Sequence, residues 1–287
     1  MREMSSTVGG TRLAYWCSSA VDRPAASRTV LLLHGLNADH DGLLTLTRLW
    51  PDTRVVSPDL PGFGRSGPLA GAHCLENYAR VLDGFCAALD LRDVTVVGHS
   101  LGASIALALA SAYPRRVREL VLISPVSSRN GPDTWPVRAY YGLGAALPAR
   151  AARFWFLSRA AVYLSDRSMF TTADRRVRRR ILESDYDTAA RAEVRAIVEI
   201  YRSIRDTPMA AVAGRIPAPT VVVGGERDRL ASPAALAALH RHLARSELHV
   251  VPRAGHLWSV EEPRAATRVI LSALGRLAGA AVADRAG

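Results

Sequence analysis

The feature that most constrains the fold is an alternation of short apolar runs with longer helical patterns. Six runs rich in Val, Leu and Ile are predicted to be strands: Thr29–Leu33, Arg54–Ser57, Val94–Val97, Leu120–Ile123, Thr220–Val223 and Leu248–Val251. Helices are predicted at residues 41–50, 75–90, 101–113, 233–244 and 263–278, and Thr11–Ser18 is expected to add an edge strand. Continuous apolar strands separated by helices indicate a parallel sheet that is covered on both faces.

The alternation breaks between about Pro125 and Arg215. This stretch contains helical patterns rich in Arg, Ala and aromatic residues, and it has no convincing strand pattern. We therefore predict a helical cap at residues 126–213, inserted into a core domain that comprises residues 1–125 and 214–287. Only short ends, at Met1–Thr7 and Gly279–Gly287, are expected to be disordered.

The basic residues are all arginines, and their distribution bears on possible partners. The chain has a formal net charge of +11, but its arginines are spread along the sequence and mixed with acidic residues. This favours a bias in codon usage over a polyanionic partner, so no nucleic-acid partner is predicted. The run Arg175–Arg180, followed by Glu183, Asp185 and Asp187, is interpreted as one solvated helix face. The absence of Lys excludes Schiff-base chemistry and a Walker-type phosphate loop.

Cysteine usage and the N-terminus bear on compartment and cofactors. The three cysteines have no metal-ligand spacing, and a disulfide framework is not expected in a chain of this size. Reduced thiols and the lack of an apolar leader predict a cytoplasmic protein without a signal peptide. No apolar run reaches the ~18 residues that a membrane span needs. No metal and no cofactor are predicted, and nothing in the sequence indicates an oligomeric state.

The strongest chemical signal is Gly98-His99-Ser100-Leu101-Gly102, which lies between the strand Val94–Val97 and a helix. In a strand–turn–helix context this G-x-S-x-G pattern predicts a strained turn that exposes the serine hydroxyl. Gly98 and Gly102 leave room for the turn, and the Leu101 N–H points toward the same spot. The alternative is a glycine-rich turn with a bystander serine, but the residues described next favour Ser100 as a nucleophile.

A serine nucleophile needs a base, and the base needs a carboxylate that orients it. His256 follows the last predicted strand and Asp228 follows the strand before it, so both lie at strand carboxyl ends together with Ser100. Glu226 is a rival for Asp228, whereas Asp133 lies too far beyond its strand to be favoured. His99 adjoins Ser100 but is expected to face another way.

A second oxyanion donor is expected from an earlier strand end, since two backbone donors normally serve this purpose. His34-Gly35 follows the strand Thr29–Leu33 and would let the Leu36 N–H point into the site beside that of Leu101. His34 is expected to fix this loop by hydrogen bonding. The run Asp59–Ser66 is interpreted as a rigid turn without a chemical role.

Together, His34-Gly35, Asp59–Ser66, Gly98–Gly102, Asp228 and Gly255-His256 resemble the α/β-hydrolase superfamily. The chain is similar in particular to the capped esterase, haloperoxidase-like and carbon–carbon hydrolase branches. The resemblance covers about residues 10–125 and 215–278. It implies a mainly parallel sheet of about eight strands with a lid inserted after the sixth. A serine at position 100 counts against the branches that attack with a carboxylate.

The cap is predicted to enclose an apolar chamber for a small hydrophobic substrate. It holds ten of the eighteen aromatic residues, most of which are expected to pack the cap onto the core. Part of Phe154-Trp155-Phe156 is expected to face the chamber. The candidates for lining the pocket are His34, Trp135, Trp155 and Trp258.

These features lead to three hypotheses about function. The leading one is hydrolysis of an ester, thioester or lactone through an acyl-enzyme on Ser100. A second keeps the site but carries out carbon–carbon hydrolysis, acyl transfer, or a lyase or cyclase step of secondary metabolism. A third is a receptor that only binds its ligand, and the complete set of Ser, His and Asp argues against it.

Overall fold

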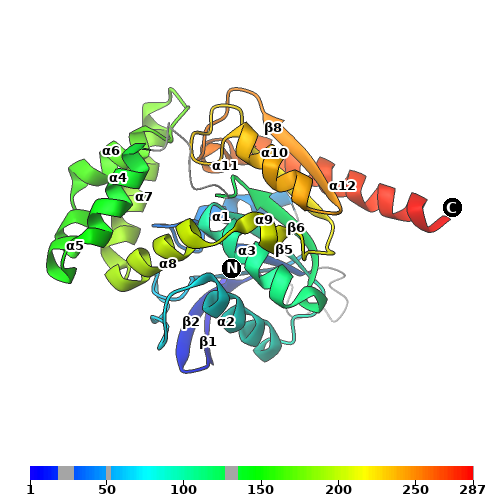
Figure 1. The fold of residues 1–287 in the computed structure, drawn as a ribbon, viewed down its shortest axis with the longest axis horizontal. Coiled ribbons are helices and arrows are strands. Elements are labelled where there is room, and N and C mark those ends of the chain that lie inside the picture. Colours follow the sequence, from blue (N-terminus) through cyan, green and yellow to red (C-terminus); the bar gives the residue numbers. More distant parts are fainter. Residues whose placement is uncertain (19–28, 50–52, 127–134, 287) are drawn as a thin grey trace.

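A computed structural model of the protein describes residues 1–18, 29–49, 53–126 and 135–286 (Figure 1). Its strands form one eight-stranded sheet in the order β1-β2-β4-β3-β5-β6-β7-β8. The strands are β1 (Arg2–Val8), β2 (Thr11–Cys17), β3 (Thr29–Leu33), β4 (Arg54–Pro58), β5 (Val94–His99), β6 (Val117–Ile123), β7 (Thr220–Gly225) and β8 (Ser246–Val251). Strands β3 to β8 are parallel, and β2 is antiparallel to both of its neighbours. The prediction of a mainly parallel sheet with helices on both faces is confirmed.

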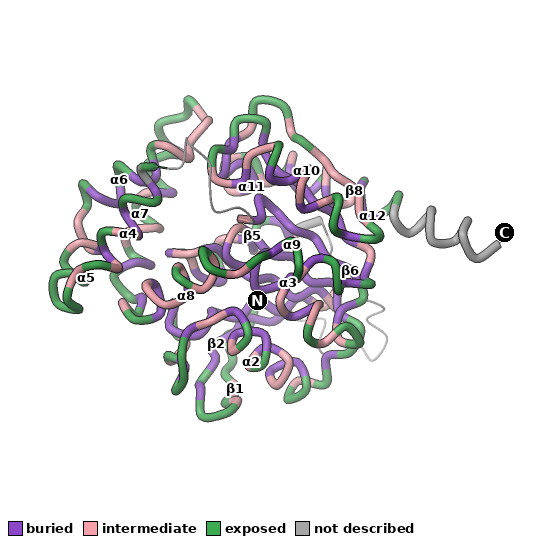
Figure 2. Tube along the Cα trace, in the orientation of Figure 1, coloured by how far each residue is buried: buried purple, intermediate pink, exposed green. Residues whose placement is uncertain are grey.

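Alternate residues of the central strands enter two separate cores, which is why these strands read as continuous apolar runs. Leu31, Val96 and Leu122 face the core beneath α2 (Leu75–Ala88), α3 (Leu101–Ala112) and α10 (Pro233–His242). Val97 and Val223 face the other core, beneath α1 (Asp41–Leu44), α11 (Trp258–Glu261) and α12 (Pro263–Ala286). Figure 2 shows the buried strands between these helical layers.

Both chain ends differ from the prediction of disorder. Residues 2–8 form β1, which pairs along its full length with β2 from Arg2 opposite Cys17 to Val8 opposite Thr11. Its side chains are mostly exposed, so it carried no apolar signal, and main-chain pairing holds it in place. At the other end, the backbone of α12 continues to Ala286 rather than ending near residue 278. The predicted helix at 41–50 is one turn, α1, followed by a 3₁₀ helix at Thr45–Leu49.

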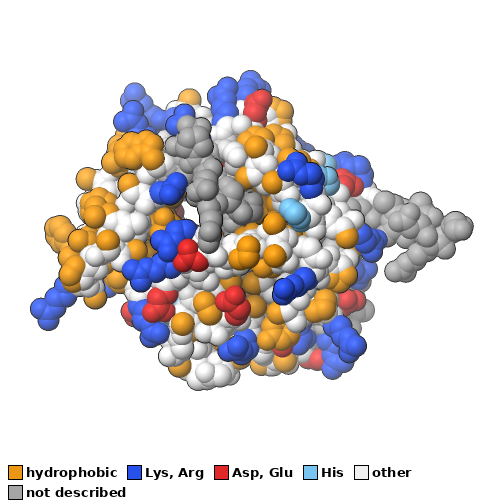
Figure 3. Space-filling model, in the orientation of Figure 1, with side chains coloured by type: hydrophobic (Ala, Val, Ile, Leu, Met, Phe, Trp, Pro, Cys, Tyr) orange, Lys and Arg blue, Asp and Glu red, His pale blue; other side chains and the backbone are white. Residues whose placement is uncertain are grey.

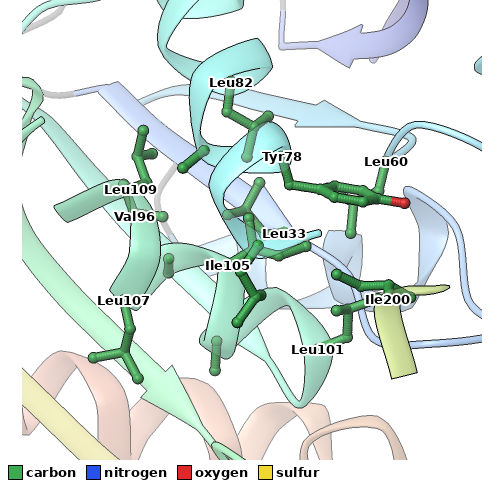
Figure 4. Close-up of a cluster of buried hydrophobic side chains, with 14 of the residues drawn as sticks. Leu33, Leu60, Tyr78, Leu82, Val96, Leu101, Ile105, Leu107, Leu109 and Ile200 are labelled. Atoms are coloured by element: carbon green, nitrogen blue, oxygen red, sulfur yellow. The ribbon is translucent and has the colours of Figure 1, made fainter. Parts of the chain in front are cut away.

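The described residues between β6 and β7, in the segment for which a cap was predicted, form six helices. They are α4 (Trp135–Ala146), α5 (Ala149–Phe156), α6 (Arg159–Arg167), α7 (Arg175–Arg191), α8 (Val194–Asp206) and α9 (Met209–Ala213). Helices α4 to α7 stand to one side of the sheet and its helices (Figure 1). Helix α8 returns to the main core, where Ile200 lies next to Leu101 at the start of α3 (Figure 4). Helix α9 packs on α3 and α10.

The surface is basic without forming one continuous basic patch on the face shown in Figure 3. Arginines are scattered over that face and acidic side chains lie among them. Among the described residues, no helix is both long enough and apolar enough to cross a membrane.

Candidate active site

Ser100 occupies a strained turn between β5 and α3. Its φ and ψ angles are 52° and −111°, outside the regions that L-residues normally adopt. A Cβ atom at Gly98 would overlap the backbone of Gly102, and one at Gly102 would overlap the backbone of Leu33. Both glycines are therefore required by close backbone approach. The turn is held by a 2.9 Å hydrogen bond from the Ser100 N–H to the Ile123 carbonyl of β6.

The structure brings Ser100, His256 and Asp228 together at the carboxyl ends of β5, β8 and β7. The Ser100 Oγ lies 3.0 Å from His256 Nε2. On the other side of the ring, His256 Nδ1 lies 2.9 Å from Asp228 Oδ2 and 3.1 Å from Asp228 Oδ1. This geometry allows Nδ1–H to donate to the carboxylate and leaves Nε2 free to accept the serine proton.

The Asp228 carboxylate is both buried and well supplied with hydrogen-bond donors. The backbone N–H groups of Leu230 and Ala231 each donate to Oδ1 at 2.9 Å. Burial alone would raise the pKa of Asp228, but the charge of His256 and these hydrogen bonds outweigh it and hold the pKa below its usual value. The group is thus an anion at neutral pH, as a carboxylate that steadies an imidazolium must be.

The rival carboxylates are placed elsewhere. Glu226 is exposed, and its Oε2 accepts a 2.8 Å hydrogen bond from the Arg253 N–H. It braces the loop between β8 and His256 instead of contacting the imidazole. Asp133 lies outside the described residues.

His34 fixes the loop after β3, as predicted. Its Nδ1 donates to the Gly35 carbonyl at 2.8 Å, and its Nε2 accepts from the Leu60 N–H at 2.9 Å. Burial lowers the pKa of His34, so the ring is neutral, and both nitrogens are already engaged. Leu36 and Leu101 line the same cavity as Ser100, and Leu101 begins helix α3, whose N-terminal dipole favours negative charge.

Two supports of the His256 loop gave no signal in the sequence. His99 Nε2 donates to the His256 carbonyl at 3.1 Å, and burial together with the neighbouring His256 lowers the pKa of His99 to about 4. A neutral His99 therefore holds the backbone of His256 in place. On the other side, Thr171 Oγ1 accepts from the Gly255 N–H at 3.1 Å and donates to Glu261 at 2.8 Å. Residues that act through backbone atoms of distant segments leave no motif to find.

A cavity of about 780 Å³ opens above Ser100 and His256. Helices α4, α7 and α8 and the turn after α6 supply much of its wall, including Val137, Tyr141, Met169, Ile181, Tyr201 and Ile204. Its size is that of a pocket for a small molecule.

Only one of the four predicted pocket residues, His34, is among the described residues that line this cavity. Trp135 is 67% exposed, and Trp155 donates its Nε1–H to the Tyr140 carbonyl in a separate outer pocket. Trp258 faces the core on the opposite side of the sheet, because α11 turns its ring under β7. The prediction for these three tryptophans was wrong, because the rotation of each helix about its axis turns the tryptophan side chain away from the cavity.

The run Phe154-Trp155-Phe156 also turns away from the cavity. Phe154 is exposed, and Phe156 is buried against Tyr140 and Tyr141 of α4. The prediction of one solvated face on α7 holds for Glu183 and Asp187 but was wrong for Asp185, which lines the cavity. Among the described residues, no group of three or more His, Cys, Asp or Glu could hold a metal ion.

Comparison with known proteins agrees with this architecture. The alpha/beta hydrolase fold family matches residues 28–263. A 2-hydroxy-6-oxononadienedioate/2-hydroxy-6-oxononatrienedioate hydrolase of Cupriavidus pinatubonensis is 27% identical over 93% of this chain and 92% of its own. A pimeloyl-[acyl-carrier protein] methyl ester esterase of Neisseria meningitidis is 28% identical over 81% of this chain and 88% of its own. The enol-lactonase of Burkholderia xenovorans superimposes with a TM-score of 0.78 at 20% identity, covering 95% of this chain and all of the other.

The chain belongs to the alpha/beta hydrolase fold family. The two relatives named above match over most of their length, and both are hydrolases: one acts on oxo-dienedioates and the other is an esterase.

Proposed function

We propose that the protein is a serine hydrolase that cleaves an ester, thioester or lactone of a small hydrophobic substrate. The observation that carries this proposal is the continuous hydrogen-bonded chain from Ser100 Oγ through His256 to Asp228, beside a cavity of about 780 Å³ that Ser100 and His256 line. The apolar side chains of that cavity support a substrate with a hydrophobic acyl part.

In the proposed reaction, His256 Nε2 takes the Ser100 proton while Oγ attacks the carbonyl carbon. The Leu36 and Leu101 N–H groups hold the developing oxyanion, and Asp228 stabilises the imidazolium. Collapse of the tetrahedral intermediate breaks the bond to the leaving group, which receives the proton from His256. Water then loses a proton to His256, attacks the acyl-enzyme and releases the acid, and the proton returns to Ser100 Oγ.

The direct test combines a fluorophosphonate probe with a panel of p-nitrophenyl acyl esters. We expect labelling on Ser100, and a fall in kcat of at least about 10⁴-fold in Ser100→Ala. Ser184→Ala is the matched control, because Ser184 lines the same cavity and has no place in the proposed hydrogen-bonded chain. Folded wild-type protein that resists the probe, or equal labelling of Ser100→Ala, would refute the proposal.

Carbon–carbon hydrolysis is the second candidate, since the full-length relative from Cupriavidus pinatubonensis is named as a hydrolase of oxo-dienedioates. Both reactions would use Ser100 and His256, so the substrate separates them. Loss of the conjugated dienoate absorbance with such a substrate, at a kcat/KM above that of every ester tested, would favour carbon–carbon cleavage.

A further inference from the structure

Two aspartates from neighbouring helices of the 126–213 segment meet in the cavity wall. Asp166 lies near the end of α6 and Asp185 lies on α7, and both line the cavity that holds Ser100. Their carboxyl groups lie close enough to shift each other's pKa, and one can donate to the other only if it keeps its proton. Burial raises the pKa of Asp166 to about 7, and burial together with the charge of Asp166 raises the pKa of Asp185 well above its usual value. Near neutral pH the pair therefore shares one proton and carries a negative charge.

No cation among the described residues balances this pair. Neither aspartate forms an ion pair with them, and the three arginines that line the cavity, Arg138, Arg180 and Arg205, are exposed to solvent. Asp166 is only 5% exposed, and its Oδ2 atom has no hydrogen-bond partner within the described part of the chain. A buried carboxylate oxygen that lacks a donor is costly to fold, so the arrangement points to a role in binding.

A second unpartnered acceptor lies in the same wall. Asn37 donates from Nδ2 to the Tyr141 hydroxyl at 3.2 Å, but its Oδ1 atom is buried without a partner among the residues that the structure describes. Asn37 is itself 8% exposed and comes from the loop after β3, which also carries Leu36. The rings of Tyr141 and Tyr201 stack with their centroids 5.4 Å apart and line the cavity as well. Aromatic faces attract cations.

We propose that Asp166, Asp185 and Asn37 form an ammonium subsite, here called the acid wall. An ammonium group supplies several N–H donors and one positive charge, which are the two things that the acid wall lacks. This subsite rests on the proposed hydrolysis at Ser100. It implies that the substrates are acyl compounds that carry a protonated amine remote from the scissile carbonyl. A carboxylate at that end would meet the negative charge of the acid wall and bind poorly.

The test is a series of p-nitrophenyl esters with ω-amino acyl chains of increasing length, each paired with the plain alkyl ester of equal length. At the chain length that reaches the acid wall, kcat/KM should favour the amino ester by at least about tenfold. The matching ω-hydroxy ester should be intermediate and the ω-carboxy ester the poorest.

Variants then locate the preference. Asp166→Asn and Asp185→Asn should each reduce the amino-to-alkyl ratio toward one, while Asp187→Asn, on an exposed position of α7, should leave that ratio unchanged. Each ratio is measured within one enzyme, so a general loss of activity cancels. Three results would each overturn the proposed ammonium subsite. The first is an amino-to-alkyl ratio near one at every chain length in the wild type, and the second is a hydroxy ester that reacts as well as the amino ester. The third is an unaltered ratio in both of the acid-wall variants.

Calorimetry with n-hexylammonium on the wild-type protein separates the two proposals. Saturable binding of hexylammonium, absent with n-hexanol, supports the acid wall even if no ester is turned over, and in that case the proposed reaction alone fails. Ester turnover without any hexylammonium binding and without amino-ester preference leaves the reaction intact and overturns the acid wall.

Discussion

Replacement of Asp166 by asparagine should stabilise the protein, and the gain should grow with pH. Asparagine has nearly the same shape as aspartate and can donate to Asp185, but it carries no charge. Burial raises the pKa of Asp166 from 3.8 to about 7. Between these values the folded protein holds a proton that the unfolded chain has released, so the stability due to this group is full below about pH 4 and is lost as pH rises to about 7.

The size of the effect follows from the shift. About 3 pH units at about 1.4 kcal/mol each give a cost of about 4 kcal/mol in the wild type above pH 7. The Asp166→Asn variant avoids this cost, so the difference in unfolding free energy between variant and wild type should be small near pH 4 and should approach that upper limit at about pH 8.

Urea unfolding followed by circular dichroism, in buffers of constant ionic strength, measures this difference across the pH range. Asp187→Asn serves as the control, because the residue is exposed on α7 and its stability difference should stay flat with pH. A pH-independent difference for Asp166→Asn, or a variant that is less stable than the wild type at pH 8, would refute the account of a buried, uncompensated carboxylate.

Two further predictions concern groups outside the acid wall. Thr171→Val removes the hydroxyl that joins the Gly255 N–H to Glu261, so the loop before His256 should loosen. We expect kcat for a p-nitrophenyl ester to fall roughly 10- to 100-fold and Thr171→Ser to restore it. An unchanged kcat in Thr171→Val would show that this link does not position His256. Burial lowers the pKa of His73 from 6.5 to about 4, so folding disfavours its protonation and its contribution to stability is lost as pH falls through this window. Gln at position 73 does not titrate, so the free energy of unfolding of the wild type, measured in urea, should fall relative to that of His73→Gln. The expected fall is about 1.4 kcal/mol per pH unit between pH 6.5 and about 4. A difference in unfolding free energy that stays constant with pH would contradict this prediction.

The central sheet and the serine turn could be predicted because their signals are local. Strands β3 to β8 are buried on both faces, so each is a short apolar run between turn residues. The strain at Ser100 needs glycines at fixed offsets, and parallel strands bring their carboxyl ends to one edge. The positions of Ser100, Asp228 and His256 after three such strands therefore predicted their meeting from sequence order alone.

Other features depended on contacts that sequence order does not encode. Strand β1 has an exposed, polar sequence, and only pairing with β2 makes it a strand. Trp258 lies close to His256 in the chain, yet the phase of α11 turns its ring into the opposite core.

The acid wall is the clearest case of this limit. Asp185 follows an arginine run in a segment that reads as a solvated helix, and Asp166 is nineteen positions away on another helix. Their approach to each other and to Asn37 is set by how α6 and α7 pack above the loop after β3. Local sequence thus determined the strands and the strained turn, because backbone sterics and apolar periodicity act over a few residues. Tertiary packing decided which side chains face the cavity, because that depends on the relative rotation of helices that are separated in the chain.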